Sequence, residues 1–224
     1  MFVTGRHLSR FVPLSVRYGR KPLLATRVSF TSASAGGDDE EGGNGGYMSK
    51  FRGNPGKHSP AATPKEILIA GVGTLVGVGA LSSVHFGLSP GDATTVLGSF
   101  GATSVLIFGY PAAPFSQPRN VIGGHMLSAF CGVCASQYLT GLLPFPWAAG
   151  PIAVSVATMA MMATRTVHPP AGGTCLLAVL GAAKFQAMGF FYLIPAGLGA
   201  TSLVLIGAVF NNVYKERSYP DYWW

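Results

Sequence analysis

The chain has 224 residues, of which 49% are hydrophobic and only 10% charged, and it contains 31 glycines. This composition is far from that of an average soluble domain. Between Ile67 and Tyr214 the formal charges are limited to Asp92, Arg119, Arg165 and Lys184. A region with so few charges suits a lipid bilayer and could hardly stay soluble. We therefore predict an all-α, polytopic membrane helix bundle.

The net charge of +7 comes almost entirely from residues 1–37, which hold six basic residues and no acidic one. Because the rest of the chain is nearly balanced, we exclude a nucleic-acid partner. The segment is rich in Arg, Ser and Thr and has no apolar run suited to secretion, which is typical of an organellar transit peptide. A disordered cytosolic tail is the alternative.

Mitochondrial and chloroplast transit peptides overlap in composition. Arginines spread through the first twenty residues favour the mitochondrial inner membrane over the chloroplast envelope. Residues 38–63 are rich in Gly, Asp and Glu and are interpreted as a disordered linker. They are followed by a transmembrane domain over residues 64–214 and a short polar tail over residues 215–224.

The transmembrane domain divides into about six helical segments. We expect them near residues 64–86, 92–110, 121–141, 151–164, 172–186 and 189–210. The first contains Gly73 and Gly77, a spacing that permits close helix packing. The fifth is too short to cross a hydrocarbon core of ~30 Å at 1.5 Å per residue. It is therefore a candidate for a short or discontinuous helix facing a cavity.

Basic residues predict the topology. Placing the lysines and arginines before the first span on the inner face puts Arg119, Arg165 and the C-terminal tail there too. Six segments then leave both ends of the domain on one face. A re-entrant fifth segment would instead move the tail to the other face.

Two stretches indicate a parallel internal repeat. GGHMLSAFCG at residues 123–132 and GGTCLLAVLG at residues 172–181 share the pattern GGxxLxAxxG at an offset of 49 residues. A proline-containing polar break precedes each copy, after an apolar run. Paired breaks at corresponding places are the sequence feature that points to a transport site.

The motif VHPPAGGT at residues 167–174, together with QPRNVIGGH at residues 117–125, resembles the HPP family of integral membrane proteins. That family takes its name from a His-Pro-Pro tripeptide, here His168, Pro169 and Pro170. The likeness covers roughly residues 64–214. It implies four transmembrane helices and, because plant members are associated with nitrite transport across the chloroplast envelope, nitrite as a candidate substrate.

We predict that the two breaks bind a small inorganic anion near mid-membrane. Helix N-termini present free N–H groups and a positive dipole end to an anion. The candidate residues are the amides of Gly123, Gly124, Gly172 and Gly173, the charges of Arg119 and Arg165, further hydrogen bonds from Gln117, Asn120, His125 and Thr174, and the break His168, Pro169 and Pro170. His168 would then carry a coupled proton.

Each group also has a simpler interpretation. The arginines would be ordinary positive-inside residues, the glycines would serve helix packing, and His168 would bond a neighbouring carbonyl. These alternatives stay open at the sequence level.

The sequence contains few features that an enzyme active site would need. It lacks paired carboxylates in the apolar region and any GxSxG, HExxH or phosphate-binding loop. The three cysteines are interpreted as buried thiols. We expect no catalytic residue, metal or cofactor.

We predict a transporter or channel for a small inorganic anion, with nitrite first. The alternative is a scaffold or assembly protein of an organelle membrane, in which glycine-rich helix faces bind partners or a second copy. A membrane enzyme using His168 or a cysteine ranks third, because no second catalytic group stands at a recognisable spacing.

Overall fold

The structure is a computed structural model that describes residue 51, residues 60–88 and residues 97–224. The chain divides into two units, Met1–His58 and Ser59–Trp224, and the helices below belong to the second. The predicted transit peptide, most of the predicted linker and Asp92 lie outside the described residues. The organellar address therefore stays a prediction.

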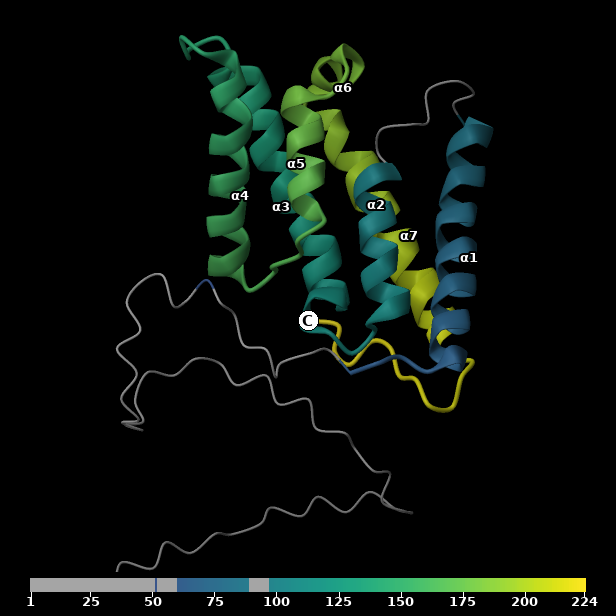
Figure 1. Cartoon of the computed structure of the whole chain (residues 1–224). Helices are drawn as coiled ribbons and strands as arrows, with labels where there is room; N and C mark the ends of the chain where they lie inside the picture. The colour runs from purple at the N-terminus through teal and green to yellow at the C-terminus, as the bar shows by residue number, and fades with distance from the viewer. Residues whose placement is uncertain (1–50, 52–59, 89–96) are drawn as a thin grey trace, which may run out of the picture. The chain divides into compact units, whose positions relative to one another are not determined.

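The described part of the chain is helical and contains no strand, as predicted (Figure 1). In chain order the helices are α1 (Pro64–Leu88), α2 (Leu97–Ser104), α3 (Pro118–Cys134), α4 (Ala149–Thr164), α5 (Ala171–Leu180), α6 (Ala183–Met188) and α7 (Leu193–Asn211). π-helical turns extend α2 over Val105–Gly109 and α3 over Ala135–Leu139. Short 3-10 turns at Pro114–Ser116, Pro146–Ala148 and Gly189–Tyr192 precede α3, α4 and α7.

Three helical segments of the described residues are long and apolar enough to cross a membrane. They are Pro64–Val84, Pro146–Thr164 and Ala183–Asn211. Gly98–Gly109 and Ala171–Leu180 are shorter apolar helices. The fifth helical segment was predicted to extend to residue 186, but α5 ends at Leu180. The following residues form the separate helix α6, which belongs to the apolar segment that includes α7.

The helices alternate in direction, so that α1, α3 and α5 run one way and α2, α4 and α7 run the other (Figure 1). The start of α1 and the C-terminal tail lie at the same end. Lys65 Nζ stands 2.8 Å from Glu216 Oε1 and ties them together. Both ends of the domain therefore lie at the same end of the bundle, as predicted, while the membrane face at that end and the path of the fifth segment across the membrane stay predictions.

The fifth helical segment is short, as the sequence predicted, and a non-helical stretch precedes it. The α4 helix ends at Thr164, where Arg165 adopts a left-handed conformation (φ 58°, ψ 37°), and α5 begins only at Ala171. Two prolines without N–H groups keep the helix from starting earlier. The stretch before α5 turns at His168, where the Ala171 N–H donates to the His168 carbonyl at 2.9 Å. The ten helical residues of α5 rise about 15 Å at 1.5 Å per residue, about half of a hydrocarbon core of ~30 Å.

Glycines set the closest helix contacts. A Cβ on Gly73 or Gly77 would come within 2.6 and 2.5 Å of the Phe108 ring, which is fully buried between α1 and α7. A Cβ on Gly132 would come within 2.6 Å of the Cys175 carbonyl oxygen on α5. The close packing predicted for Gly73 and Gly77 is confirmed.

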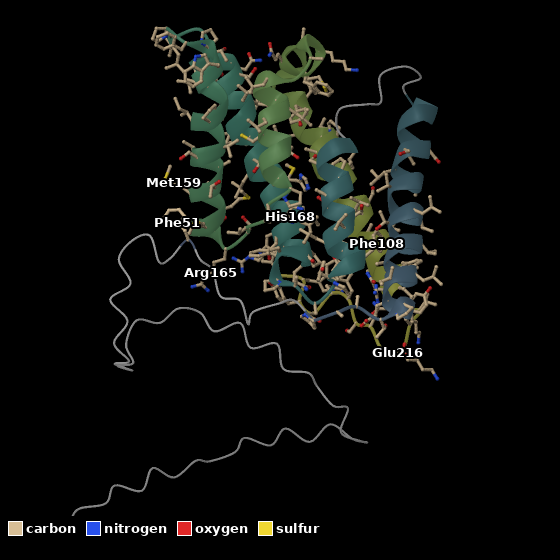
Figure 2. The ribbon with its side chains drawn as sticks, in the orientation of Figure 1. Phe51, Phe108, Met159, Arg165, His168 and Glu216 are labelled. Atoms are coloured by element: carbon tan, nitrogen blue, oxygen red, sulfur yellow. The ribbon has the colours of Figure 1, made fainter. Side chains whose placement is uncertain are left out.

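Large apolar side chains also cover the outside of the bundle. Leu75, Leu198 and Val209 are 72, 65 and 73% exposed, and Met159 points outward from α4 (Figure 2). Soluble proteins rarely expose so much apolar surface. An apolar surface of this kind suits contact with lipid tails, which agrees with the predicted membrane location.

Candidate functional site: a buried histidine cluster

Five polar side chains meet inside the bundle, and we call them the histidine cluster. They are Ser99 and Thr103 from α2, His125 from α3, His168 from the break before α5, and Thr174 from α5. Both imidazoles and the Thr103 side chain are fully buried. Figure 2 shows His168 at mid-height between the helices. Three helices and one interrupted segment therefore bring their polar groups to one apolar interior.

The Thr103 hydroxyl is the centre of the cluster. Its Oγ1 lies 2.9 Å from His125 Nε2 and 2.9 Å from His168 Nε2, and 3.0 Å from the Ser99 carbonyl oxygen. The two imidazole centroids are 5.0 Å apart. A single hydroxyl thus joins residues 22 and 65 positions away in the chain.

The outer side of each ring also has a partner. His125 Nδ1 lies 2.7 Å from Thr174 Oγ1, whose hydroxyl donates to Ser99 Oγ at 3.0 Å. His168 Nδ1 lies 2.7 Å from the carbonyl oxygen of Phe115. All four ring nitrogens are therefore within hydrogen-bond distance of a partner, as buried polar groups require.

Local sequence explains how these groups reach the interior. Ser99 and Thr103 are four residues apart and share one face of α2. Pro169 and Pro170 each disfavour a helical conformation at the residue before them, so His168 enters the bundle on a non-helical segment. Gly124 gives this segment room, because a Cβ there would lie 2.7 Å from His168 Cβ and 3.0 Å from the Thr166 carbonyl oxygen.

The His-Pro-Pro break thus places His168 inside the bundle, in contact with α2 and with the Phe115 carbonyl. A model of the HPP family, described as its transmembrane region, matches residues 59–220. The chain belongs to the HPP family.

Two curated proteins of Dictyostelium discoideum, each described as a transmembrane protein, are similar to this HPP protein. One is 35% identical over 181 residues, covering 80% of this chain and 57% of the relative. The other is 34% identical over 180 residues, covering 80% of this chain and 63% of the relative. The chain therefore spans about three fifths of the length of these relatives. No solved structure matches it.

Two grooves of this HPP protein are lined by residues in or close in sequence to the histidine cluster. One, of about 480 Å³, is lined by Arg119, Gly123, Met126, Leu127, Thr164, Thr166, Leu193 and Trp224. The other, of about 450 Å³, is lined by Gly98, Ser99, Gly173, Leu176, Leu177, Leu180 and Gly181. Ser99 belongs to both the second groove and the cluster, whereas the two rings have no exposed surface. The cluster is closed in this conformation.

The predicted pair of glycine-led helix starts is not formed. The α3 helix begins at Pro118, so Gly123 and Gly124 lie inside it rather than at its N-terminus. In the first turn of α5 the N–H groups of Gly172 and Gly173 donate to the Pro169 and Pro170 carbonyls at 3.1 and 3.0 Å. Extra helical residues before Gly123 and these turn hydrogen bonds occupy the amides that an anion would need.

The two arginines lie away from the imidazoles. Arg165 is exposed at the end of α4 (Figure 2). Arg119 Nη2 donates to the Thr164 carbonyl oxygen at 2.8 Å and so ties the start of α3 to the end of α4. Its Nε is buried without a hydrogen-bond partner among the described residues. This placement fits the simpler interpretation of positive-inside residues.

Gln117 and Asn120 act as structural ties to backbone groups. Gln117 Nε2 donates to the Pro111 and Ala113 carbonyls, and its Oε1 accepts from the N–H of Asp221 in the tail. Asn120 Nδ2 donates to the Val167 carbonyl at 2.9 Å, holding the break against α3. Neither side chain is directed into the histidine cluster.

Sequence reasoning found His125, His168 and Thr174 but missed Ser99 and Thr103. A signal was available, since hydroxyls four residues apart in an apolar helix usually face the bundle interior and bond across helices.

Proposed function

We propose that this HPP protein transports a small inorganic anion, nitrite first, and that the histidine cluster is its binding centre. The observation that carries the proposal is the pair of fully buried imidazoles around one threonine hydroxyl in an apolar membrane bundle. Ionisable groups at such depth are costly and are a functional site by default.

The chemistry of the cluster suits a small oxyanion. Imidazole N–H and hydroxyl groups are hydrogen-bond donors. In the closed cluster these groups bond within the protein, and opening of the cluster would free those of two threonines, a serine and two histidines for an anion. An anion that leaves water needs such donors in place of its hydration shell. This site replaces the glycine amides proposed from the sequence.

The architecture also supports transport. Discontinuous helices near mid-membrane are the usual place of substrate sites in transporters. Here the non-helical residues before α5 carry His168. One groove includes Ser99 of the closed cluster, and the other is lined by Gly123 and Thr166, each two residues from a cluster histidine. Movement of this segment would open the cluster towards one groove or the other. We place the protein in an organelle membrane, with the mitochondrial inner membrane before the chloroplast envelope, on the composition of residues 1–37.

A non-transporting scaffold is the second candidate. It is favoured by the complete closure of both rings and by the position of Arg165 at the end of the bundle. A Cβ placed on Gly71 or Gly79 of α1 would meet no other part of the bundle within 4 Å, so another helix could approach there.

The test is uptake by liposomes that contain the purified full chain. Nitrite, nitrate, chloride and bicarbonate are offered in parallel, and empty liposomes give the background. We expect uptake with nitrite, and a loss of at least tenfold in His168→Asn and His125→Gln. Thr158→Val is the control, because Thr158 is exposed on α4 and its hydroxyl bonds only its own helix, at Val154. Wild-type uptake equal to empty liposomes for all four anions would reject the proposal.

A further inference from the structure

We propose that the histidine cluster binds one proton and that this proton crosses the membrane together with the anion. The inference rests on the proposed function and adds the coupling ion and the stoichiometry. It follows from counting the hydrogens available around the Thr103 hydroxyl.

The first imidazole is oriented by a carbonyl. His168 Nδ1 lies 2.7 Å from the Phe115 carbonyl oxygen, which can only accept a hydrogen bond. The hydrogen of a neutral His168 must therefore be on Nδ1. Its Nε2 then presents a lone pair to Thr103 Oγ1 at 2.9 Å.

The second imidazole is oriented by a hydroxyl. Thr174 uses its hydrogen to donate to Ser99 Oγ at 3.0 Å, so at 2.7 Å it accepts from His125 Nδ1. The hydrogen of a neutral His125 is then also on Nδ1. Its Nε2 presents a second lone pair to Thr103 Oγ1 at 2.9 Å.

Thr103 has one hydrogen for these two lone pairs, and the Ser99 carbonyl oxygen competes for it at 3.0 Å. With both rings neutral, one buried imidazole nitrogen faces an oxygen that has no hydrogen left to donate, which is costly. One added proton removes the conflict. The protonated ring donates to Thr103 Oγ1, and Thr103 donates to the other ring. A second proton is opposed by repulsion between rings 5.0 Å apart.

The positive charge has no protein counter-ion within the described residues. The groups that contact the rings are Phe100 and Thr103 of α2, the Phe115 carbonyl and Thr174 of α5. Thr174 in turn bonds to Ser99 through its hydroxyl and to the Tyr192 hydroxyl through its carbonyl. The described carboxylates, Glu66, Glu216 and Asp221, belong to the α1 start and the tail. A buried cation needs a partner. The anion supplies it, so proton and anion stabilise each other and move together without net charge.

Transport across liposomes tests the coupling. Phosphatidylcholine liposomes with the full chain carry a pH-sensitive dye, and a sodium nitrite gradient is applied at equal pH inside and outside. Empty liposomes give the passive flux of nitrous acid, which is subtracted. We expect interior acidification of one proton per nitrite, at a rate unchanged when a potassium gradient with valinomycin sets the membrane potential. Nitrite uptake that follows the potential without acidification overturns the coupling and leaves the proposed function standing. Absence of nitrite uptake also overturns the coupling, and absence of uptake for all four anions overturns the proposed function as well.

Imidazole nitrogen NMR tests the proton site itself. At pH 6 in sodium nitrite we expect one added proton shared by the two rings, and a smaller protonated fraction in sodium gluconate. Thr103→Val removes the shared hydroxyl and should abolish both the sharing and the acidification, while Thr158→Val keeps them. His125→Gln and His168→Asn assign the signals. Two added protons in nitrite, or equal protonation in both salts, would contradict a proton held jointly with the anion.

Discussion

Replacement of Gly132 by alanine tests whether the contact between α3 and α5 holds the histidine cluster together. The new Cβ would stand 2.6 Å from the Cys175 carbonyl oxygen and 2.8 Å from the Ala178 Cβ, whereas ordinary contact begins near 3.4 Å. One neighbour is backbone and cannot rotate away. The two helices must therefore separate by about 0.8 Å at this point.

The cost follows from packing and propensity. Overpacking of a well-packed site costs about 1–3 kcal/mol, while alanine in place of glycine within a helix returns about 1 kcal/mol. Gly101→Ala is the matched control, because Gly101 lies in α2 and no atom stands within 4 Å of the point that its new Cβ would occupy. Both variants gain the helix propensity of alanine, so the difference between their free energies of unfolding contains only the overpacking cost at Gly132, about 1–3 kcal/mol.

The assay is thermal unfolding of both variants in the same detergent. At roughly 2–4 °C per kcal/mol for a chain of this size, we expect Gly132→Ala to melt about 2–12 °C below Gly101→Ala. Separation of α3 from α5 also stretches the 2.7 Å contact between His125 and Thr174, so nitrite uptake should fall. A melting temperature for Gly132→Ala equal to or above that of Gly101→Ala would refute the reasoning.

Three further predictions concern the end of the bundle that carries the tail. Arg165→Gly relieves a left-handed backbone and should raise stability by about 1 kcal/mol with uptake retained, measured by melting and liposome flux; loss of uptake would restore a ligand role for this arginine. Tyr219→Phe removes the buried hydrogen bond to the Ser116 carbonyl and should cost about 1 kcal/mol, measured by melting; an unchanged midpoint would contradict it. The hydrogen bond from Lys65 holds the pKa of the Glu216 carboxyl below its usual value. The stabilising effect of this pair is therefore complete above the usual carboxyl pKa and is lost as the pH falls through the lowered one. Carbon NMR should show the pKa of Glu216 rise in Lys65→Met, and no change would argue against the pair.

Local features of the sequence predicted the bundle well. The apolar spans, the proline break at residues 165–170 and the position of both ends of the domain at one end of the bundle all rest on properties that act within a short stretch of chain. The packing of Gly73 and Gly77 was also correct, because small residues four apart permit a close helix contact whatever the partner. The internal repeat stays a prediction, although His125 and Thr174, which it aligns, are hydrogen-bonded to each other.

Local sequence features did not predict the geometry of the candidate site. Gly123 and Gly124 were expected in the first turn of a helix that begins near residue 121, but Pro118 can begin a helix and α3 starts there, which places both glycines beyond its first turn. The amides of Gly123 and Gly124 are therefore hydrogen-bonded within α3, whereas the prediction had them free to bind an anion. Thr103 was missed for a different reason, because hydroxyls spaced four apart in an apolar helix indicate a face directed into the bundle but not which partner each one meets.

The sequence by itself determined that this HPP protein is a membrane helix bundle interrupted before α5, since hydrophobicity and proline geometry are local properties of the chain. Tertiary structure alone decided that Thr103, His125 and His168 share one hydrogen-bond centre. The rotation of each helix about its axis depends on how glycines and large side chains of several helices fit together, and no single segment contains that information.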